Sequence, residues 1–129
     1  ISAPTIAQHA ALACFADETL AILEARRAEF ARRRDYLLPA LRALGFRIAV
    51  EPQGAFYLYA DIAAFGGDSY ALCRHLLETE YVAITPGLDF GRHQAGRHVR
   101  FAYTQSLPRL EQAVERIARG LRSWRPDAV

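Results

Sequence analysis

His98-Val99-Arg100-Phe101-Ala102-Tyr103-Thr104 is the stretch of sequence that decides the fold. Its bulky residues Val99, Phe101 and Tyr103 alternate with smaller or polar ones, which is typical of a strand with one buried face. We expect that face to meet helices and Arg100 to project from the opposite face. A guanidinium with an open approach can bind a carboxylate through two parallel hydrogen bonds. The stretch therefore predicts a strand and, on it, a candidate for ligand binding.

Arg100 also has a purely structural interpretation. A strand arginine can pair with a nearby acid, and Asp61 and Glu51 are the candidates in this chain. Composition alone favours the ion pair over a ligand site. The residues by themselves leave both interpretations open.

Periodicity assigns the rest of the chain to helices and strands. The pattern predicts helices over residues 5–15, 18–44, 69–80 and 106–123, and strands over residues 46–51, 55–61, 81–85 and 97–104. With the first two helices counted as one region, the order is α-β-β-α-β-β-α. That order predicts an α+β fold, an α/β sandwich in which helices pack on a small mixed β-sheet.

Several details of this assignment can be tested against a structure. Phe46, Ile48 and Val50 alternate with polar or small residues, so we expect a half-buried strand that forms a hairpin with the next strand. Gly45 stands where a left-handed cap would end the long helix. Pro39 lies inside the same helix and should kink or restart it.

Apolar residues in the helices predict what is buried. The third helix should bury Leu72, Leu76 and Leu77 on one face. Cys14 and Cys73 lie far apart in apolar helical surroundings. We therefore expect two buried thiols rather than a disulfide, a metal site or a nucleophile.

The composition is that of one ordinary globular domain. The chain has 129 residues, 52% of them hydrophobic, and 16 arginines nearly balance 14 acidic residues to a net charge of +2. That balance argues against a nucleic-acid partner, and the arginines of residues 26–34 alternate with acids as on an exposed helix face. No apolar run reaches the roughly 18 residues of a membrane span. No signal peptide opens the chain, so we expect no membrane partner and a cytoplasmic location.

Lysine and methionine are both absent from the chain. The lack of an initiator methionine predicts that the natural N-terminus lies elsewhere. The lack of lysine means that no side chain here can hold a cofactor as a Schiff base.

Five stretches in succession resemble one protein family. They are Ile1–Ala11, Arg32–Phe46, Gln53–Tyr59, Val82–Gly91 and His98–Tyr103. In this order they are similar to the C-terminal part of the fold-type-I, class I and II pyridoxal-phosphate aminotransferases. The resemblance implies that the intact protein moves an amino group between an amino acid and a 2-oxo acid, with pyridoxal 5'-phosphate as the cofactor.

The resemblance also implies roles for residues and regions. Arg100 would bind the substrate α-carboxylate, and Gly54, Ala55 and Phe90 are weaker substrate-binding candidates. The regions would be residues 1–24 as the end of the large domain with an interdomain helix, 25–124 as the small domain that closes the active site, and 125–129 as a disordered tail. The Schiff-base lysine would belong to a missing N-terminal large domain. This segment would then bind no cofactor covalently, would be inactive alone, and would derive from a homodimer.

Two other functions compete with this one. A non-enzymatic α+β regulatory or binding domain could use Arg100 for an acidic small ligand. An RNA-binding domain could use the arginine-rich helix, and steeply salt-dependent RNA binding would be its mark.

Overall fold

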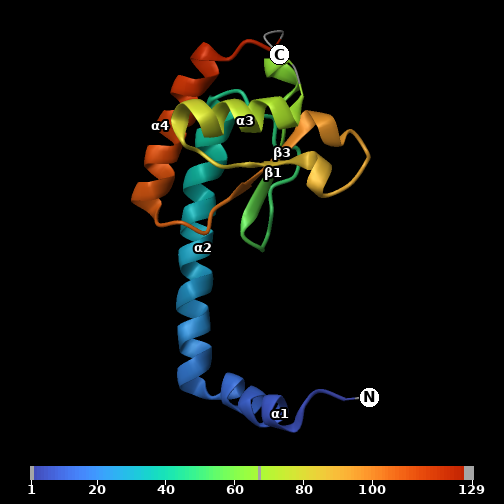
Figure 1. Cartoon of the computed structure of the whole chain (residues 1–129). Helices are drawn as coiled ribbons and strands as arrows, with labels where there is room; N and C mark the ends of the chain where they lie inside the picture. Colours follow the sequence, from blue (N-terminus) through green and yellow to red (C-terminus); the bar gives the residue numbers. More distant parts are fainter. Residues whose placement is uncertain (1, 67, 127–129) are drawn as a thin grey trace.

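In the computed structural model, which describes residues 2–66 and 68–126, three helices cover one face of a small sheet and a fourth lies apart on a long arm (Figure 1). The helices are α1 (Thr5–Leu12), α2 (Asp17–Ala43), α3 (Ser69–Glu80) and α4 (Leu107–Ser123). The strands are β1 (Tyr57–Asp61), β2 (Thr85–Pro86) and β3 (His98–Ala102). Short 3₁₀ turns lie at η1 (Ala13–Phe15), η2 (Ala63–Phe65), η3 (Gly87–Asp89) and η4 (Ala95–Arg97). The predicted α+β class is confirmed.

The sheet is antiparallel, whereas we expected a mixed one. β3 lies in the middle, with β1 on one side and β2 on the other, and both pair with it antiparallel. α3 connects β1 to β2, so these two strands run the same way. Because β3 lies between them, no parallel pair forms among the described residues.

The strand predicted over residues 46–51 is reduced to one bridge, which corrects the predicted element order at this point. Arg47 pairs antiparallel with Asp61, and Phe46 and Ile48 are buried as expected. Val50, however, is 77% exposed. The chain leaves the sheet on its way to Pro52, which has no N–H group for a ladder.

The core lies between the sheet and the helices. The C-terminal half of α2 buries Leu37, Leu38 and Leu41, α3 buries Leu72 and Leu76, and α4 buries Leu110 and Ile117. These side chains form one cluster with the sheet residues Leu58, Val99, Phe101 and Tyr103. Leu77, which we expected in the core, is 50% exposed on the outer side of α3.

The long helix ends as the sequence predicts. Gly45 has a φ of 100°, a left-handed value that favours glycine, and its N–H donates to the carbonyl of Arg42. α2 runs on through Pro39, so the predicted restart does not occur. Asp68 begins α3 by accepting a hydrogen bond from the N–H of Ala71 at 2.9 Å.

The N-terminal arm carries its apolar side chains on the outside (Figure 1). Residues Thr5–Phe15 meet α2 at an angle of 75°, and Ile6, Leu12 and Phe15 are 69–85% exposed. Cys14 is exposed too, which corrects the prediction of a buried thiol, because it lies on the arm in a turn that buries none of its residues. Cys73 is buried as predicted, and burial raises its pKa to about 12.

Two further predictions concern the ends of the chain and a membrane span. Ile1 and residues 127–129 of the predicted tail lie outside the described residues. In the described part, no single helix has the length and hydropathy to cross a membrane, although the bent pair Thr5–Phe15 and Asp17–Ala43 passes that test together.

Candidate functional site

Arg100 lies at the centre of the sheet. It pairs with Tyr59 of β1 on one side and with Thr85 of β2 on the other. Its neighbours Val99 and Phe101 are 0% and 3% exposed against the helices. Arg100 therefore projects from the opposite face, as the alternation predicts, and we call this the open face of the sheet.

Aromatic rings surround the Arg100 guanidinium on the open face. Its central carbon lies 4.7 Å from the ring centroid of Phe90 and 5.8 Å from that of Tyr57. Both distances are within the range of cation–π attraction. One terminal nitrogen donates to the Thr85 hydroxyl at 3.4 Å, a long hydrogen bond. The rings restrict the guanidinium, and among the described residues the Thr85 hydroxyl is its one hydrogen-bond partner.

The Nε atom of Arg100 is buried and has no hydrogen-bond partner among the described residues. Native proteins seldom leave a buried donor unpaired, because the lost hydration costs about 1–3 kcal/mol. An anion that approached the guanidinium edge could satisfy this donor and a terminal nitrogen together.

The ion-pair interpretation of Arg100 is wrong. Asp61 pairs with Arg47 and Arg97, and Glu51 lies 3.7 Å from Arg42. Within the described ranges, no acid lies at ion-pair distance from the Arg100 guanidinium. Both acids that could have explained this arginine structurally already have other partners.

Asp61 is instead the electrostatic anchor of the sheet. The side chain is 4% exposed and binds the Arg97 guanidinium at 2.7 Å and the Ala63 N–H at 2.8 Å. Hydrogen bonds from Arg97 and then Arg47 hold the pKa of the carboxyl well below its ordinary value, against the opposing effect of burial. The cluster ties β1 to residue 47 and to η4, next to β3.

A glycine positions Phe90 under Arg100. A Cβ atom on Gly87 would lie 2.5 Å from the Ala95 carbonyl oxygen and 2.7 Å from the Tyr59 hydroxyl, so only glycine fits there. The Phe90 N–H then donates to the Gly87 carbonyl at 2.9 Å. Phe90 is 49% exposed and lies on the open face rather than in the core.

Gly54 and Ala55 lie in the loop before β1, next to the buried phenol of Tyr103. The Tyr103 hydroxyl is 3.2 Å from the carbonyl oxygens of both residues. Gly54 has open space where a Cβ would be, and Ala55 has a left-handed φ of 62°. The turn therefore has its positive φ at the alanine, and neither residue is among the contacts of Arg100.

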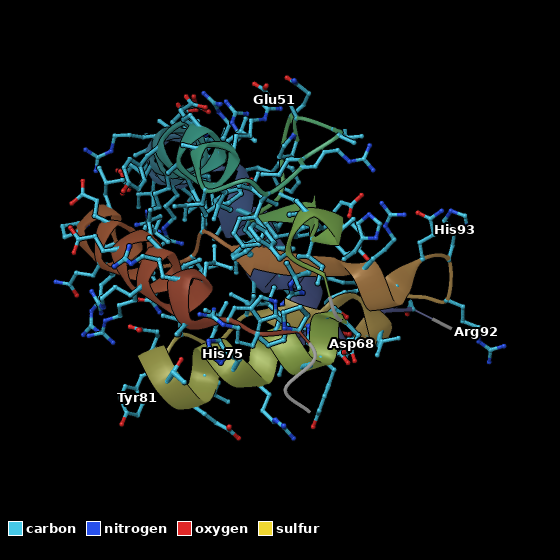
Figure 2. The ribbon with its side chains drawn as sticks, turned by 90° about the horizontal axis from the view of Figure 1, so that it is seen from above. Glu51, Asp68, His75, Tyr81, Arg92 and His93 are labelled. Atoms are coloured by element: carbon cyan, nitrogen blue, oxygen red, sulfur yellow. The ribbon has the colours of Figure 1, made fainter. Side chains whose placement is uncertain are left out.

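Three neighbours of this site escaped the sequence reasoning. Thr85 and Tyr57 contact Arg100, and Tyr59 stacks on His98 with ring centroids 4.9 Å apart and planes 2° apart. The alternation of Tyr57 and Tyr59 along β1 was a usable signal, because residues two apart share a face. By contrast, Arg92 and His93 point away from the sheet at the tip of the loop between η3 and η4 (Figure 2).

Comparison with known proteins decides the family. The family description "Aminotransferase class I and II" matches residues 1–117. The chain belongs to the class I and II aminotransferases.

Relatives within this aminotransferase family resemble the whole chain. A valine–pyruvate aminotransferase of Mycobacterium tuberculosis is 37% identical over 127 residues, which is 98% of this chain and 32% of the relative. The crystal structure of an aminotransferase from the same organism matches with a TM-score of 0.87 and 38% identity, over 94% of this chain and 31% of that one. An aspartate aminotransferase from Thermus thermophilus, solved with maleate, matches with a TM-score of 0.78 and 41% identity, over 92% and 30%. The chain thus spans about a third of the length of the curated relatives it matches.

Proposed function

We propose that this chain is the substrate-closing part of a pyridoxal-phosphate-dependent aminotransferase and that Arg100 binds the α-carboxylate of an amino acid or 2-oxo acid. One observation carries the proposal: a central, half-buried guanidinium has a buried Nε without a hydrogen-bond partner and no acidic partner among the described residues. A carboxylate can take two parallel hydrogen bonds from such a group. The similarity to an aspartate aminotransferase solved with maleate, a dicarboxylate, supports the same chemistry.

The surroundings of Arg100 suit orientation of a substrate. Phe90 and Tyr57 limit the directions in which the guanidinium can point. A substrate held by two parallel bonds has one plane fixed, and fixing geometry before reaction lowers the barrier by proximity and orientation. Aromatic rings also displace water around the charge, which strengthens its attraction for an anion.

The cofactor would be held by residues outside this chain. Pyridoxal phosphate supplies the electron sink for amino-group transfer, and aminotransferases hold it on a lysine amine. This chain contains no lysine, so its residues do not fit a covalent cofactor site. We therefore expect the 129-residue chain alone to have no aminotransferase activity.

The regions of the chain would have different neighbours in the intact enzyme. We propose that residues 1–24 form the interdomain helix and the end of the large domain, and that residues 25–124 form the small domain. The exposed Ile6, Leu12 and Phe15 would then pack on the large domain or on the second subunit of a homodimer in the cytoplasm. Gly54, Ala55 and Phe90 remain proposed as weaker substrate contacts.

The competing functions have less support. Family membership argues against a non-enzymatic binding module. On α2, Arg27, Arg32 and Arg33 pair with Glu24 or Glu29, so these arginines form an ion-paired helix face rather than a free basic patch.

Substitution of Arg100 in the longer enzyme tests the proposal. Arg100→Leu should lower kcat/KM about 30-fold to several thousand-fold, since losing one partner of a desolvated charge pair costs roughly 2–5 kcal/mol. Arg100→Lys should recover only part of this loss, because an ammonium cannot make the two parallel bonds. Arg92→Leu, in the loop that points away from the sheet, is the matched control and should leave kcat/KM unchanged. A kcat/KM within about threefold of wild type for Arg100→Leu would contradict the proposed role of Arg100 in carboxylate binding.

A further inference from the structure

Tyr59 lies directly opposite Arg100 on the open face of the sheet. The two residues are register partners in the pairing of β1 with β3. Leu58 and Ala60, on either side of Tyr59, are both 0% exposed, so the Tyr59 side chain projects from the same face as Arg100. Its ring stacks on that of His98, the diagonal neighbour, with centroids 4.9 Å apart and planes 2° apart. This stacking fixes the direction in which the Tyr59 ring points.

His98 is itself held at two points. Its backbone belongs to β3, where its register partner is Asp61. Its Nδ1–H donates to the carbonyl oxygen of Gln94 at 2.9 Å, because a carbonyl can only accept a hydrogen bond. This bond joins the imidazole to the loop between η3 and η4. His98 therefore gives the Tyr59 ring a flat partner of defined orientation.

The other contacts of Tyr59 are with the turn η3 and with Phe90, which follows it. A Cβ atom on Gly87 would lie 2.7 Å from the Tyr59 hydroxyl, so this hydroxyl lies close against the backbone at the start of η3. The Tyr59 ring meets the Phe90 ring edge-on, with centroids 6.5 Å apart and an interplanar angle of 87°. Edge-to-face pairs at this separation are favourable. Tyr59 thus contacts the chain on both sides of η3.

Phe90 connects this arrangement to the Arg100 guanidinium. The central carbon of the guanidinium lies 4.7 Å from the Phe90 centroid and 5.8 Å from that of Tyr57, so Phe90 is the closer ring. The hydrogen bond to the Thr85 hydroxyl, at 3.4 Å, is long and fixes the direction of the guanidinium only weakly. That direction therefore depends mainly on Phe90, and the place of Phe90 depends on Tyr59.

We propose that Tyr59, held by His98, is a positioning residue for Arg100. The stacked pair fixes η3, η3 places Phe90, and the Phe90 ring sets the direction of the guanidinium before a ligand arrives. Such pre-orientation matters because a misplacement of about 1 Å can cost roughly 100-fold in rate. The expected effect on catalysis rests on the proposed function of Arg100, whereas the expected effect on geometry does not.

A double-mutant cycle in the longer enzyme tests the effect on catalysis. Tyr59→Ala should lower kcat/KM about 10- to 100-fold when Arg100 is present. In the Arg100→Leu background the loss should be less than about twofold, because no guanidinium is left to position. Tyr70→Ala truncates a tyrosine of α3 that is 61% exposed, and this matched control should leave kcat/KM unchanged. Equal losses in both backgrounds, or no loss in either, would overturn the proposal.

Substitutions of His98 provide a second test that does not depend on truncating Tyr59. His98→Ala removes the stacking partner and should lower kcat/KM about 3- to 10-fold, whereas His98→Phe restores a flat ring and should stay within about twofold of wild type. His93→Ala, in the loop that points away from the sheet (Figure 2), is the matched control and should have no effect on kcat/KM. Equal impairment of His98→Phe and His98→Ala would contradict the stacking role.

Crystal structures of the longer enzyme separate this inference from the proposed function of Arg100. Tyr59→Ala should displace the Arg100 guanidinium by about 1 Å or more, or leave it in several conformers, whichever ligand it binds. If Arg100→Leu alone left kcat/KM unchanged, the carboxylate role would fail, but a displaced guanidinium would still support positioning by Tyr59. A guanidinium that stays in place in Tyr59→Ala would show that the positioning is wrong, even if Arg100→Leu is inactive.

Discussion

The two faces of β3 differ in how well their side chains are packed and hydrogen-bonded. On the face toward the helices, Val99, Phe101 and Tyr103 are 0–3% exposed in one apolar cluster. On the open face, Arg100 has a buried nitrogen with no hydrogen-bond partner in the part of the chain that the structure describes, although Asp61 lies on the neighbouring strand and binds two other arginines. One strand thus has a well-packed apolar face and a face on which a buried polar atom lacks a hydrogen bond among the described residues. We propose that the first face stabilises the fold and that the second face binds the ligand.

If this division is right, the largest change in stability comes from the core face. Phe101→Ala should lower the free energy of unfolding by roughly 3–5 kcal/mol, because it removes a buried ring and leaves a cavity. The ring also packs edge-on against Phe46 at 4.9 Å. Urea unfolding of the 129-residue chain, followed by circular dichroism, measures the loss. A loss below 1 kcal/mol would show that this face is not the main source of stability.

The ion cluster around Asp61 should rank second. Asp61→Asn leaves Arg47 and Arg97 without their carboxylate and should cost roughly 2–3 kcal/mol, since hydrogen bonds to a charged group are lost while both arginines reach water.

The same substitution should change the pH dependence of stability. The pKa of Asp61 is lowered on folding, so its contribution is complete above the ordinary carboxyl pKa and declines as the pH falls below about 4. Wild type should therefore lose stability more steeply than Asp61→Asn between about pH 4 and pH 2. Parallel curves in urea unfolding at these pH values would show that the cluster is not a stabilising anchor.

The smallest change should come from the open face, and its sign is informative. Arg100→Leu should leave the free energy of unfolding unchanged or raise it by up to about 1 kcal/mol, because it removes a buried donor that has no partner within residues 2–66 and 68–126. Residues that serve function often make the folded state less stable than other residues at the same position would. Urea unfolding beside the control Arg92→Leu provides the measurement. A loss of 2 kcal/mol or more would mean that Arg100 holds the sheet together.

Local pattern was sufficient to predict one half of this comparison. The alternation of Val99, Phe101 and Tyr103 correctly placed Arg100 on the opposite face, and Gly45 ended α2 as expected. These features depend on neighbours in sequence, where the periodicity of a strand or the φ of a glycine decides.

Long-range partners explain what the sequence did not predict. The contacts of Arg100 with Phe90 and Tyr57 join three separate segments, and no spacing along the chain encodes them. Val50 and Cys14 looked buried by pattern but are exposed, because burial requires an element to pack on them. Asp61 was a candidate partner for Arg100, yet Arg47 and Arg97 bind it, and only the register of β1 against β3 decides between them.

The most direct test asks whether Arg100 recognises the carboxylate itself. In the longer enzyme, kcat/KM is measured for an amino acid and for the matching amine that lacks the α-carboxylate, each with wild type and Arg100→Leu. If Arg100 binds the carboxylate, Arg100→Leu should lower kcat/KM at least about 30-fold for the amino acid and change it less than about threefold for the amine. An equal loss on both substrates would contradict the account, because Arg100 would then act on something other than the carboxylate.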